Sequence, residues 1–356
     1  MARLQIDGHK LCHHLEELMK WRNSETFFPL YMDVSPTSAC NQKCLVCYVN
    51  YLKQKVFTLE KNVFLNLMND LGRVGVKSVC FQGTGEPLMN KYTPQAIVAG
   101  KQAGVDMALV TNGVLFTEES LNLCLSSLSW LRFSMLEVNK DLYNMTHRGK
   151  NDDWQNVVNN IKTAVQIKKQ NNLDVVISGL FIVLPHNVET VLEATKMYKD
   201  LGLDYLVIKP VGQSCWNDYD FEKDLQIKYA ELFRAVEAET TNSFIAKVRY
   251  DLFEEEGSTP PPKKYDKCHG LHFITQIDSD GGVYPCNNFW KMPEFSLGNI
   301  HDESFESIWT GEQKKKVFDK IFYEWDLEKC QQVCRHHVIN NFLWDLSQEP
   351  QHVNFI

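Results

Sequence analysis

The sequence lacks any long apolar run, and no stretch approaches the roughly 20 uncharged apolar residues that a membrane-spanning helix requires. A signal-peptide pattern is also missing, because the first thirty residues alternate polar and apolar positions around Leu11, Leu15 and Leu18 as a short helix does. Dense Lys/Arg tracts are absent and the net charge is −8, which disfavours a nucleic-acid partner. We therefore expect a cytoplasmic protein with no membrane and no nucleic-acid partner.

Cysteine, in contrast, is abundant, with eleven residues. An odd number argues against a complete disulfide framework, so metal or redox use is the better interpretation. Seven cysteines form two groups that look like sites: Cys40, Cys44 and Cys47 near the N-terminus, and Cys268, Cys286, Cys330 and Cys334 near the C-terminus. Of the four others, Cys12, Cys80 and Cys124 lie in helix- or strand-like apolar settings and are expected to be packing residues.

The N-terminal group is the most informative motif. Its cysteines are spaced by four and three residues, so they can hold three irons of a cubane cluster and leave the fourth iron open. A zinc site usually has four ligands and an ordinary ferredoxin cluster has four thiolates. A zinc site or a chance cluster of thiols is the alternative, but an open iron that binds a substrate or cofactor fits the spacing better.

From Pro29 to about Pro210, short apolar runs alternate with longer amphipathic stretches, which is typical of βα units around a parallel sheet. The stretch Leu59–Val74, with apolar residues at a period near 3.6, is one predicted helix. We expect an α/β fold, a partial (β/α)6 barrel. Its six predicted strands are Leu30–Val34, Ser78–Gln82, Asp106–Val110, Trp130–Met135, Val175–Val183 and Tyr205–Lys209.

Ligands of parallel α/β sheets lie at the carboxyl ends of the strands, where the connecting loops converge. Four segments with functional character follow strands in this way: Cys40–Cys47, Gly83–Pro87, Thr111–Gly113 and Pro185–Asn187. We therefore expect them to meet at one mouth of the barrel.

The domain organisation follows from breaks in these patterns. We expect an N-terminal helical extension (1–29), the barrel (30–240), a linker (241–262) that includes the stiff run Gly257–Pro262, a small α+β module (263–345) and a tail (346–356). In the module, Phe273–Ile277 and Val283-Tyr284 flank Asp278–Gly282, which predicts a hairpin. Phe305–Ile321 is predicted to be one helix.

These residues resemble the radical S-adenosylmethionine (SAM) superfamily over most of the first 210 positions. The resemblance implies that the three N-terminal cysteines bind a [4Fe–4S] cluster whose open iron is chelated by SAM. Reduction then cleaves SAM to a 5′-deoxyadenosyl radical, which removes a hydrogen atom from the substrate. The glycine-rich loop implied to receive the methionine ammonium consists of Gly83, Gly85, Glu86 and Pro87.

Further SAM contacts are implied by the same resemblance. Ser134 corresponds to a ribose or carboxylate contact, Arg148 to a partner of the methionine carboxylate, and Asn187 to a cofactor contact, although Arg148 is alternatively a surface residue and Asn187 an ordinary turn residue. Tyr48, directly after Cys47, is the candidate adenine-side contact, since the residue directly before Cys47 is not aromatic. The departures from the family pattern are Val46, Thr84 and Leu136.

The C-terminal module resembles the twitch domain, a shortened relative of the SPASM domain. Cys268 and Cys286 bracket the predicted hairpin, Gly281 precedes Cys286 by five places, and Cys330 and Cys334 complete the set. The resemblance implies one auxiliary [4Fe–4S] cluster with four thiolate ligands, which favours electron relay over direct substrate binding. A structural zinc on the same four cysteines is the alternative.

Three residues at strand ends are candidates for contact with the substrate. Cys215 follows the sixth predicted strand and is a candidate hydrogen-atom donor or substrate ligand, although a thiol without function is the more common case. Lys209 and His186 are candidates for deprotonating a substrate radical. The pair His336-His337, beside Cys334, is expected on an exposed helical surface.

We expect a radical SAM oxidoreductase that performs a net two-electron oxidation, because the auxiliary cluster provides an electron acceptor. Resemblance to twitch-bearing aminocyclitol dehydrogenases suggests a sugar- or cyclitol-like small molecule as substrate and a flavodoxin- or ferredoxin-type protein as reductant. The alternative is a peptide maturase that forms crosslinks, which the short segment before Cys40 disfavours. Less favoured are a non-catalytic iron–sulfur electron carrier or scaffold, which does not need the glycine-rich loop and Arg148, and a zinc-stabilised binding module.

Overall fold

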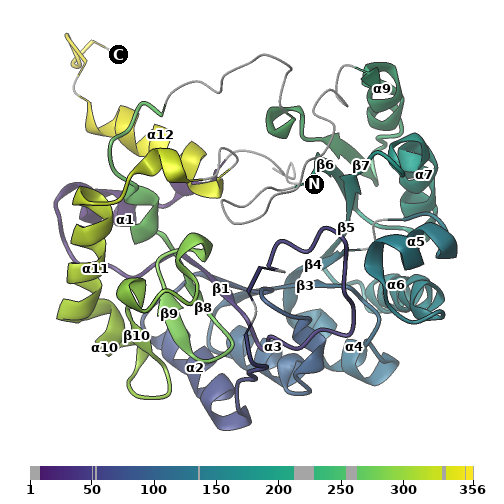
Figure 1. The fold of residues 1–356 in the computed structure, drawn as a ribbon, viewed down its shortest axis with the longest axis horizontal. Helices are drawn as coiled ribbons and strands as arrows, with labels where there is room; N and C mark the ends of the chain where they lie inside the picture. Colours follow the sequence, from purple (N-terminus) through teal and green to yellow (C-terminus); the bar gives the residue numbers. More distant parts are fainter. Residues whose placement is uncertain are drawn as a thin grey trace.

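The computed structural model describes residues 9–49, 51–52, 54–134, 137–211, 228–253, 263–330, 334–348 and 350–355. Its strands form one sheet in the order β10-β9-β8-β1-β2-β3-β4-β5-β6-β7. The sheet curves around an interior space, with helices along its outer side (Figure 1). Within the described residues, no helix is long and apolar enough to cross a membrane.

Seven neighbouring strands run parallel, from β1 to β7. They are β1 (Tyr31–Val34), β2 (Ser78–Phe81), β3 (Asp106–Thr111), β4 (Leu128–Phe133), β5 (Val176–Val183), β6 (Tyr205–Pro210) and β7 (Ile245–Val248). The helices between them are α2 (Lys61–Arg73), α3 (Thr93–Gln102), α4 (Glu118–Cys124), α5 (Lys140–His147), α6 (Asp153–Gln170), α7 (Val191–Leu201) and α9 (Ala230–Ala238). The predicted α/β architecture with six βα units is confirmed.

The predicted linker is wrong in its first part. Residues 241–262 were expected to connect two domains, but Ile245–Val248 forms β7, which pairs in parallel with β6 from Tyr205 opposite Ile245. Alternation of buried and partly buried residues along β7 is the pattern of a half-covered strand. The parallel part of the sheet thus has a seventh strand.

The C-terminal hairpin continues the same sheet. It consists of β8 (Ile274–Ile277) and β9 (Gly282–Tyr284), followed by the short strand β10 (Gly298–Asn299). The turn has Gly281 at a φ of 83°, a left-handed conformation that glycine adopts readily. β8 pairs in parallel with β1, so the predicted hairpin is confirmed but its module shares the barrel sheet.

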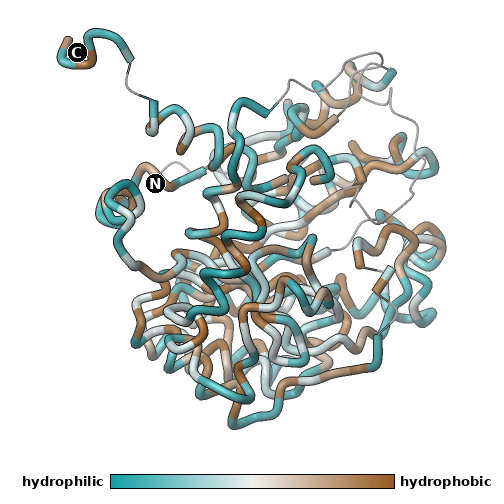
Figure 2. The backbone as a smooth tube through the Cα atoms, turned by 60° about the vertical axis from the view of Figure 1, so that its left-hand side comes forward, coloured by the Kyte–Doolittle hydropathy of each residue, from teal (hydrophilic) through white to brown (hydrophobic). Residues whose placement is uncertain are grey.

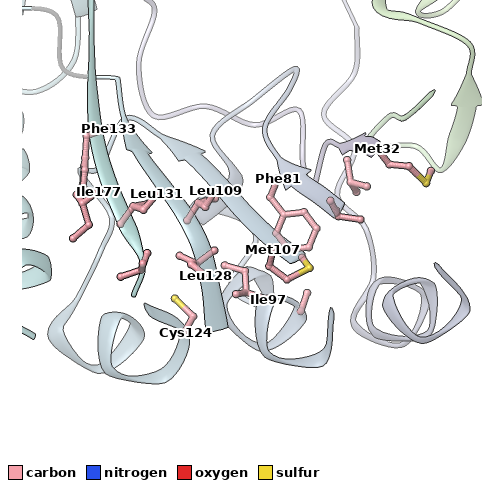
Figure 3. Packing of buried hydrophobic residues seen from close by; sticks show 14 of the residues in the cluster. Met32, Phe81, Ile97, Met107, Leu109, Cys124, Leu128, Leu131, Phe133 and Ile177 are labelled. Carbon is pink, nitrogen blue, oxygen red and sulfur yellow. The ribbon is translucent and has the colours of Figure 1, made fainter. Parts of the chain in front are cut away.

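The two faces of the strands have different surroundings. On the outer face, Phe81, Leu109 and Leu131 point toward the helices and pack against Ile97 of α3 and Cys124 of α4 (Figure 3). On the inner face, a smaller apolar cluster lines the interior of the sheet, with Leu180, Tyr205 and Val207 at its centre. Polar side chains share this inner face, and they form the site described below.

The first and last α-helices of the structure, α1 (Leu15–Arg22) and α12 (Arg335–Ser347), pack near the hairpin. The helix α1 of the N-terminal extension shares an apolar cluster with α12, which includes Leu18 and Leu343. The single helix expected over 305–321 is two helices, α10 (Phe305–Thr310) and α11 (Glu312–Tyr323), because the backbone is extended at Gly311. Residues 350–355 project from the body (Figures 1 and 2).

Candidate functional site

The loop that carries Cys40, Cys44 and Cys47 follows β1 and is anchored to the C-terminal end of α5. The backbone N–H groups of Lys43 and Leu45 donate to the carbonyls of His147 (3.1 Å) and Thr146 (2.7 Å). These are carbonyls of the last helical turn, which have no partner within the helix. The loop is therefore held at the barrel mouth by hydrogen bonds that the helix end leaves available.

The three thiols of this loop lie close enough to influence one another. Burial, together with the charges of Cys40 and Cys47, raises the pKa of Cys44 to about 12. Burial also raises the pKa of Cys40, to about 11, and that of Cys47. Isolated thiols in this place stay protonated, whereas binding to iron deprotonates them. Three thiols on one loop, near enough to shift one another's pKa, with Cys40 exposed and Cys44 and Cys47 partly buried, are a donor set that fits a cubane cluster.

His147 supports this loop from α5. Its Nδ1 lies 3.4 Å from Cys44 Sγ and 3.1 Å from Gln42 Oε1, and its ring stacks on Tyr143 at 4.0 Å. Burial lowers the pKa of His147 to about 3, so the ring is neutral. A neutral imidazole beside a thiolate acts as a hydrogen-bond donor without adding charge.

The glycines of the predicted loop are required by close backbone contacts. Gly83 has a φ of 134°, and a Cβ atom there would lie 1.8 Å from Ser35 Oγ. A Cβ atom on Gly85 would lie 2.3 Å from the carbonyl oxygen of Ala39, in the loop that leads into Cys40. Glycine at both positions therefore lets this loop pack closely against the segment that runs from β1 to Cys40.

Glu86, predicted to receive the methionine ammonium, is buried and already bound by protein groups. Its Oε1 accepts from Thr111 Oγ1 (2.6 Å) and from the backbone N–H of Leu88 (3.1 Å), and its Oε2 accepts from the N–H of Asn112 (2.7 Å). Burial raises its pKa. Glu86 thus ties the glycine-rich loop to the loop after β3. Pro87 starts the short 3-10 helix that follows.

The other predicted SAM contacts differ in their burial and in their hydrogen bonds. Ser134 lies beside the loop after β3, since its N–H donates to the carbonyl of Thr111 (2.8 Å). Arg148 is exposed and ends α5 in a left-handed conformation. Asn187 is buried, with Oδ1 and Nδ2 both engaged in its own turn, which supports the ordinary turn role. Leu136 lies outside the described residues.

Tyr48 has an unexpected partner. Its hydroxyl accepts a hydrogen bond from Asn287 Nδ2 at 2.8 Å. Tyr48 follows Cys47 and Asn287 follows Cys286, so this bond joins the two cysteine-bearing loops directly. The sequence offered no signal for this contact, because the partners are 239 positions apart.

The four C-terminal cysteines also converge. Burial raises the pKa of Cys286 well above its usual value, and the thiols of Cys334, Cys268 and Cys330 raise it further. Asn340 Nδ2 donates to Cys268 Sγ (3.2 Å), and Trp325 Nε1 donates to Cys330 Sγ (3.4 Å). Four mutually close thiols with N–H donors on two sulfurs are suited to an iron–sulfur cluster.

A cavity of about 400 Å³ borders both cysteine groups. Cys47 and Gly83 line it, and so does Cys334. Its further polar lining consists of Asp33, Tyr48, Gln82, Lys209, Gln276, Asn287 and Arg335. The volume lies in the range of small-molecule sites.

Asp33 organises the polar wall of this cavity. Its carboxylate accepts from Arg335 Nη2 at 2.6 Å and Gln276 Nε2 at 3.3 Å, and also from the side chains of Tyr31 and Gln82. With four donors, the charge of Asp33 is well compensated.

Of the candidate catalytic residues, Lys209 lines the cavity from the end of β6. Burial, together with the charges of Arg132, Arg249 and Arg335, lowers its pKa to about 8. His186 instead bonds Thr146 Oγ1 (3.0 Å) and does not line this cavity. Cys215 lies outside the described residues.

Two expectations about side chains were wrong. His336 is buried rather than exposed, with Nδ1 at 3.7 Å from Cys334 Sγ. Cys12 is exposed rather than packed, whereas Cys80 and Cys124 are buried as predicted.

Sequence reasoning also missed Glu137, a fully buried carboxylate that accepts from Thr146 Oγ1 (2.7 Å) and Asn187 Nδ2 (3.0 Å).

Two family models match the chain. The model of the radical SAM superfamily matches residues 34–197, which include the three-cysteine loop and β1 to β5. The model of SPASM, an iron–sulfur cluster-binding domain, matches residues 268–336, which include all four C-terminal cysteines. The chain is a radical SAM enzyme with a C-terminal SPASM-type domain. Radical SAM enzymes of this type bind SAM with a [4Fe–4S] cluster and an auxiliary iron–sulfur cluster, and these are its cofactors.

Similar proteins agree with this assignment. The radical SAM chain is 23% identical to the "Tungsten-containing aldehyde ferredoxin oxidoreductase cofactor-modifying protein" of Pyrococcus furiosus, over 80% of this chain and 81% of that protein. It is 21% identical to the sporulation killing factor maturation protein SkfB of Bacillus subtilis, over 80% of this chain and 65% of SkfB. The fold is similar to Streptococcus suis SuiB bound to S-adenosylmethionine, with a TM-score of 0.65, 14% identity, and coverage of 90% and 75%.

Proposed function

We propose that this radical SAM enzyme performs a net two-electron oxidation of a hydroxyl-bearing small molecule, such as a sugar or cyclitol, bound in the 400 Å³ cavity. One observation supports it most: Cys47 and Cys334, from the two cysteine groups, line the same cavity. A substrate in this cavity would lie next to both proposed cluster sites. The volume and the polar wall around Asp33 suit a polar small molecule.

The chain's own residues would hold the reacting groups as follows. Cys40, Cys44 and Cys47 would bind the SAM-binding cluster, and Gly83 and Gly85 let the glycine-rich loop pack closely against the segment that leads into Cys40, where it would contact the methionine part of SAM. When bound, SAM and this cluster supply a 5′-deoxyadenosyl radical that takes one hydrogen atom from the substrate. Loss of a further electron and a proton completes the oxidation.

The C-terminal thiols are proposed to hold the acceptor of that second electron. The 2.8 Å hydrogen bond between Tyr48 and Asn287 holds the two cysteine-bearing loops in place relative to each other. A fixed separation favours electron transfer between the substrate and the acceptor. The first electron would come from a flavodoxin- or ferredoxin-type reductant.

Lys209 is proposed to contact the substrate. With a pKa of about 8, its amine is mostly protonated at pH 7 and becomes a proton acceptor as the pH rises through 8. Cys215 remains a predicted candidate on sequence grounds.

The test is anaerobic reconstitution with SAM and dithionite, followed by chromatography for 5′-deoxyadenosine. The wild-type protein should form it and the Cys40/Cys44/Cys47 triple alanine variant should not. Cys286→Ala should form 5′-deoxyadenosine slowly without oxidised product, because the electron acceptor is lost. Equal product from Cys286→Ala and wild type would contradict the relay role.

Peptide modification is the second candidate function. SkfB is named a maturation protein, and SuiB has been solved bound to its precursor peptide SuiA. Substrate panels in the assay above should therefore include peptides. Crosslinked peptide without oxidised small molecule would favour this second function.

A further inference from the structure

A second cavity, of about 470 Å³, opens on the inner face of β4, β5 and β6. It shares Lys209 and Leu252 with the 400 Å³ cavity, so the two meet at these residues. Its lining carries four cationic side chains: Lys10, Arg132, Lys209 and Arg249. Among the described residues, no Asp or Glu lines it.

The cations of this region are unequally compensated. Arg249 forms a bidentate ion pair with Asp251, in which Nε donates to Oδ1 (2.8 Å) and Nη2 donates to Oδ2 (2.7 Å). Arg335, in the neighbouring cavity, pairs with Asp33 at 2.6 Å. Within the described ranges, neither Arg132 nor Lys209 has a carboxylate partner. Lys10 is exposed, so Arg132 and Lys209 are the two partly buried cations that are left for a ligand.

The surroundings of Arg132 favour the binding of such a ligand. Its guanidinium lies over the Trp130 ring, 4.3 Å from the centroid, which fixes the plane of the group. Its Nε is buried and has no hydrogen-bond partner in the part of the chain that the structure describes. The guanidinium is therefore incompletely paired within the protein, and an oxyanion in the cavity that Arg132 lines would offset part of this cost.

We propose that Arg132 and Lys209 bind a dianionic phosphate group of the substrate in the 470 Å³ cavity. Two uncompensated cations match a dianion better than a monoanion. The planar guanidinium contacts two phosphate oxygens at once, and the lysine adds a point charge. Calling the ligand a substrate rests on the proposed function, because the shared Lys209 brings the anchored molecule to the cavity that Cys47 and Gly83 line.

The test measures the thermal shift of the anaerobically reconstituted protein, loaded with S-adenosylhomocysteine, during titration with inorganic phosphate at constant ionic strength set by chloride. The analogue occupies the SAM site, so a remaining response belongs to a different site. Phosphate should raise Tm in a saturable way, and acetate should bind more weakly. Arg132→Met and Lys209→Met should each weaken phosphate binding about tenfold or more, for one lost charge contact.

The control variant is Lys196→Met, on the outer helix α7 with a side chain that is 56% exposed. It should keep the wild-type phosphate response. Arg132→Lys preserves the charge and should retain part of the binding, which keeps the test informative if Arg132→Met misfolds. A response equal to that of chloride, or one unchanged in Arg132→Met and Lys209→Met, would overturn the phosphate site. Acetate binding as tight as phosphate would overturn the dianion.

This binding assay is independent of SAM cleavage. If 5′-deoxyadenosine forms but phosphate does not bind, the phosphate site is wrong and the radical function stands. If phosphate binds through Arg132 and Lys209 but no cleavage occurs with any substrate, the site stands and the proposed function is wrong.

Discussion

Replacing Lys209 by methionine is predicted to stabilise the protein at neutral pH. Methionine has a similar unbranched side chain, so the substitution removes the charge and largely keeps the packing. The amine lies among Arg132, Arg249 and Arg335, and burial together with these charges lowers its pKa from 10.5 to about 8. At neutral pH the Lys209 cation is therefore less favourable in the folded protein than in the unfolded chain, where water solvates it.

The size of the effect follows from that pKa. A decrease from 10.5 to about 8 corresponds to about 3 kcal/mol, at about 1.4 kcal/mol for each pKa unit. Because the unfolded chain binds more protons between pH 8 and 10.5, the wild type gains stability as pH rises through this window. Below pH 8 the amine is protonated in both states, and the full destabilisation of the folded protein by its charge is present. Lys209→Met should thus gain most at pH 7 and nothing above pH 10.5.

The assay is thermal unfolding of the reconstituted protein in phosphate-free buffer, at pH 7 and at high pH. With an unfolding entropy of about 2.1 cal/mol/K per residue over 356 residues, a gain of about 3 kcal/mol raises Tm by about 4 °C. The exposed Lys196→Met should leave Tm within about 1 °C.

An unchanged or lower Tm for Lys209→Met at pH 7 would refute this reasoning. So would a gain of the same size at pH 7 and at pH 10.5, because the effect would then not come from the charge of the amine.

Three further predictions concern the two cluster sites. Cys44→Ala should lose the iron and sulfide of one cluster and all 5′-deoxyadenosine formation, while metal analysis still finds the auxiliary cluster; unchanged iron content would exclude Cys44 as a ligand. Gly83→Ala should weaken SAM binding at least tenfold in a titration, because its Cβ atom would lie 1.8 Å from Ser35 Oγ, and wild-type affinity would show that the loop tolerates a side chain. Asn340→Ala removes an N–H donor at 3.2 Å from Cys268 Sγ and should lower the reduction potential of the auxiliary cluster, as measured by redox titration; an unchanged potential would assign Asn340 a packing role only.

Local patterns were sufficient for much of the fold. The six βα units follow from alternating apolar runs and amphipathic stretches, and each strand predicted from Leu30 to Lys209 overlaps an observed one. The hairpin around Gly281 follows from its turn residues. β7 was not predicted because Ile245–Val248 is only four residues long, which is too short for alternation to mark it as a strand.

Part of the site was also readable in advance. Cysteine spacing and the glycine-rich loop predicted which residues the cofactors would contact, and the two family models match the stretches that contain these residues. The bond between Tyr48 and Asn287, the burial of His336 and the role of Glu137 were not predictable, since each depends on partners distant in the sequence.

The sequence by itself thus determined the class of fold, the superfamily and the cysteine ligand candidates, because periodicity and motif spacing are local properties of the chain. Only the tertiary structure decided that β8 pairs with β1, that one cavity borders Cys47 and Cys334, and that Arg132 and Lys209 share the barrel interior. These depend on strand order and on which face of each strand turns inward, and the packing of the whole sheet sets both.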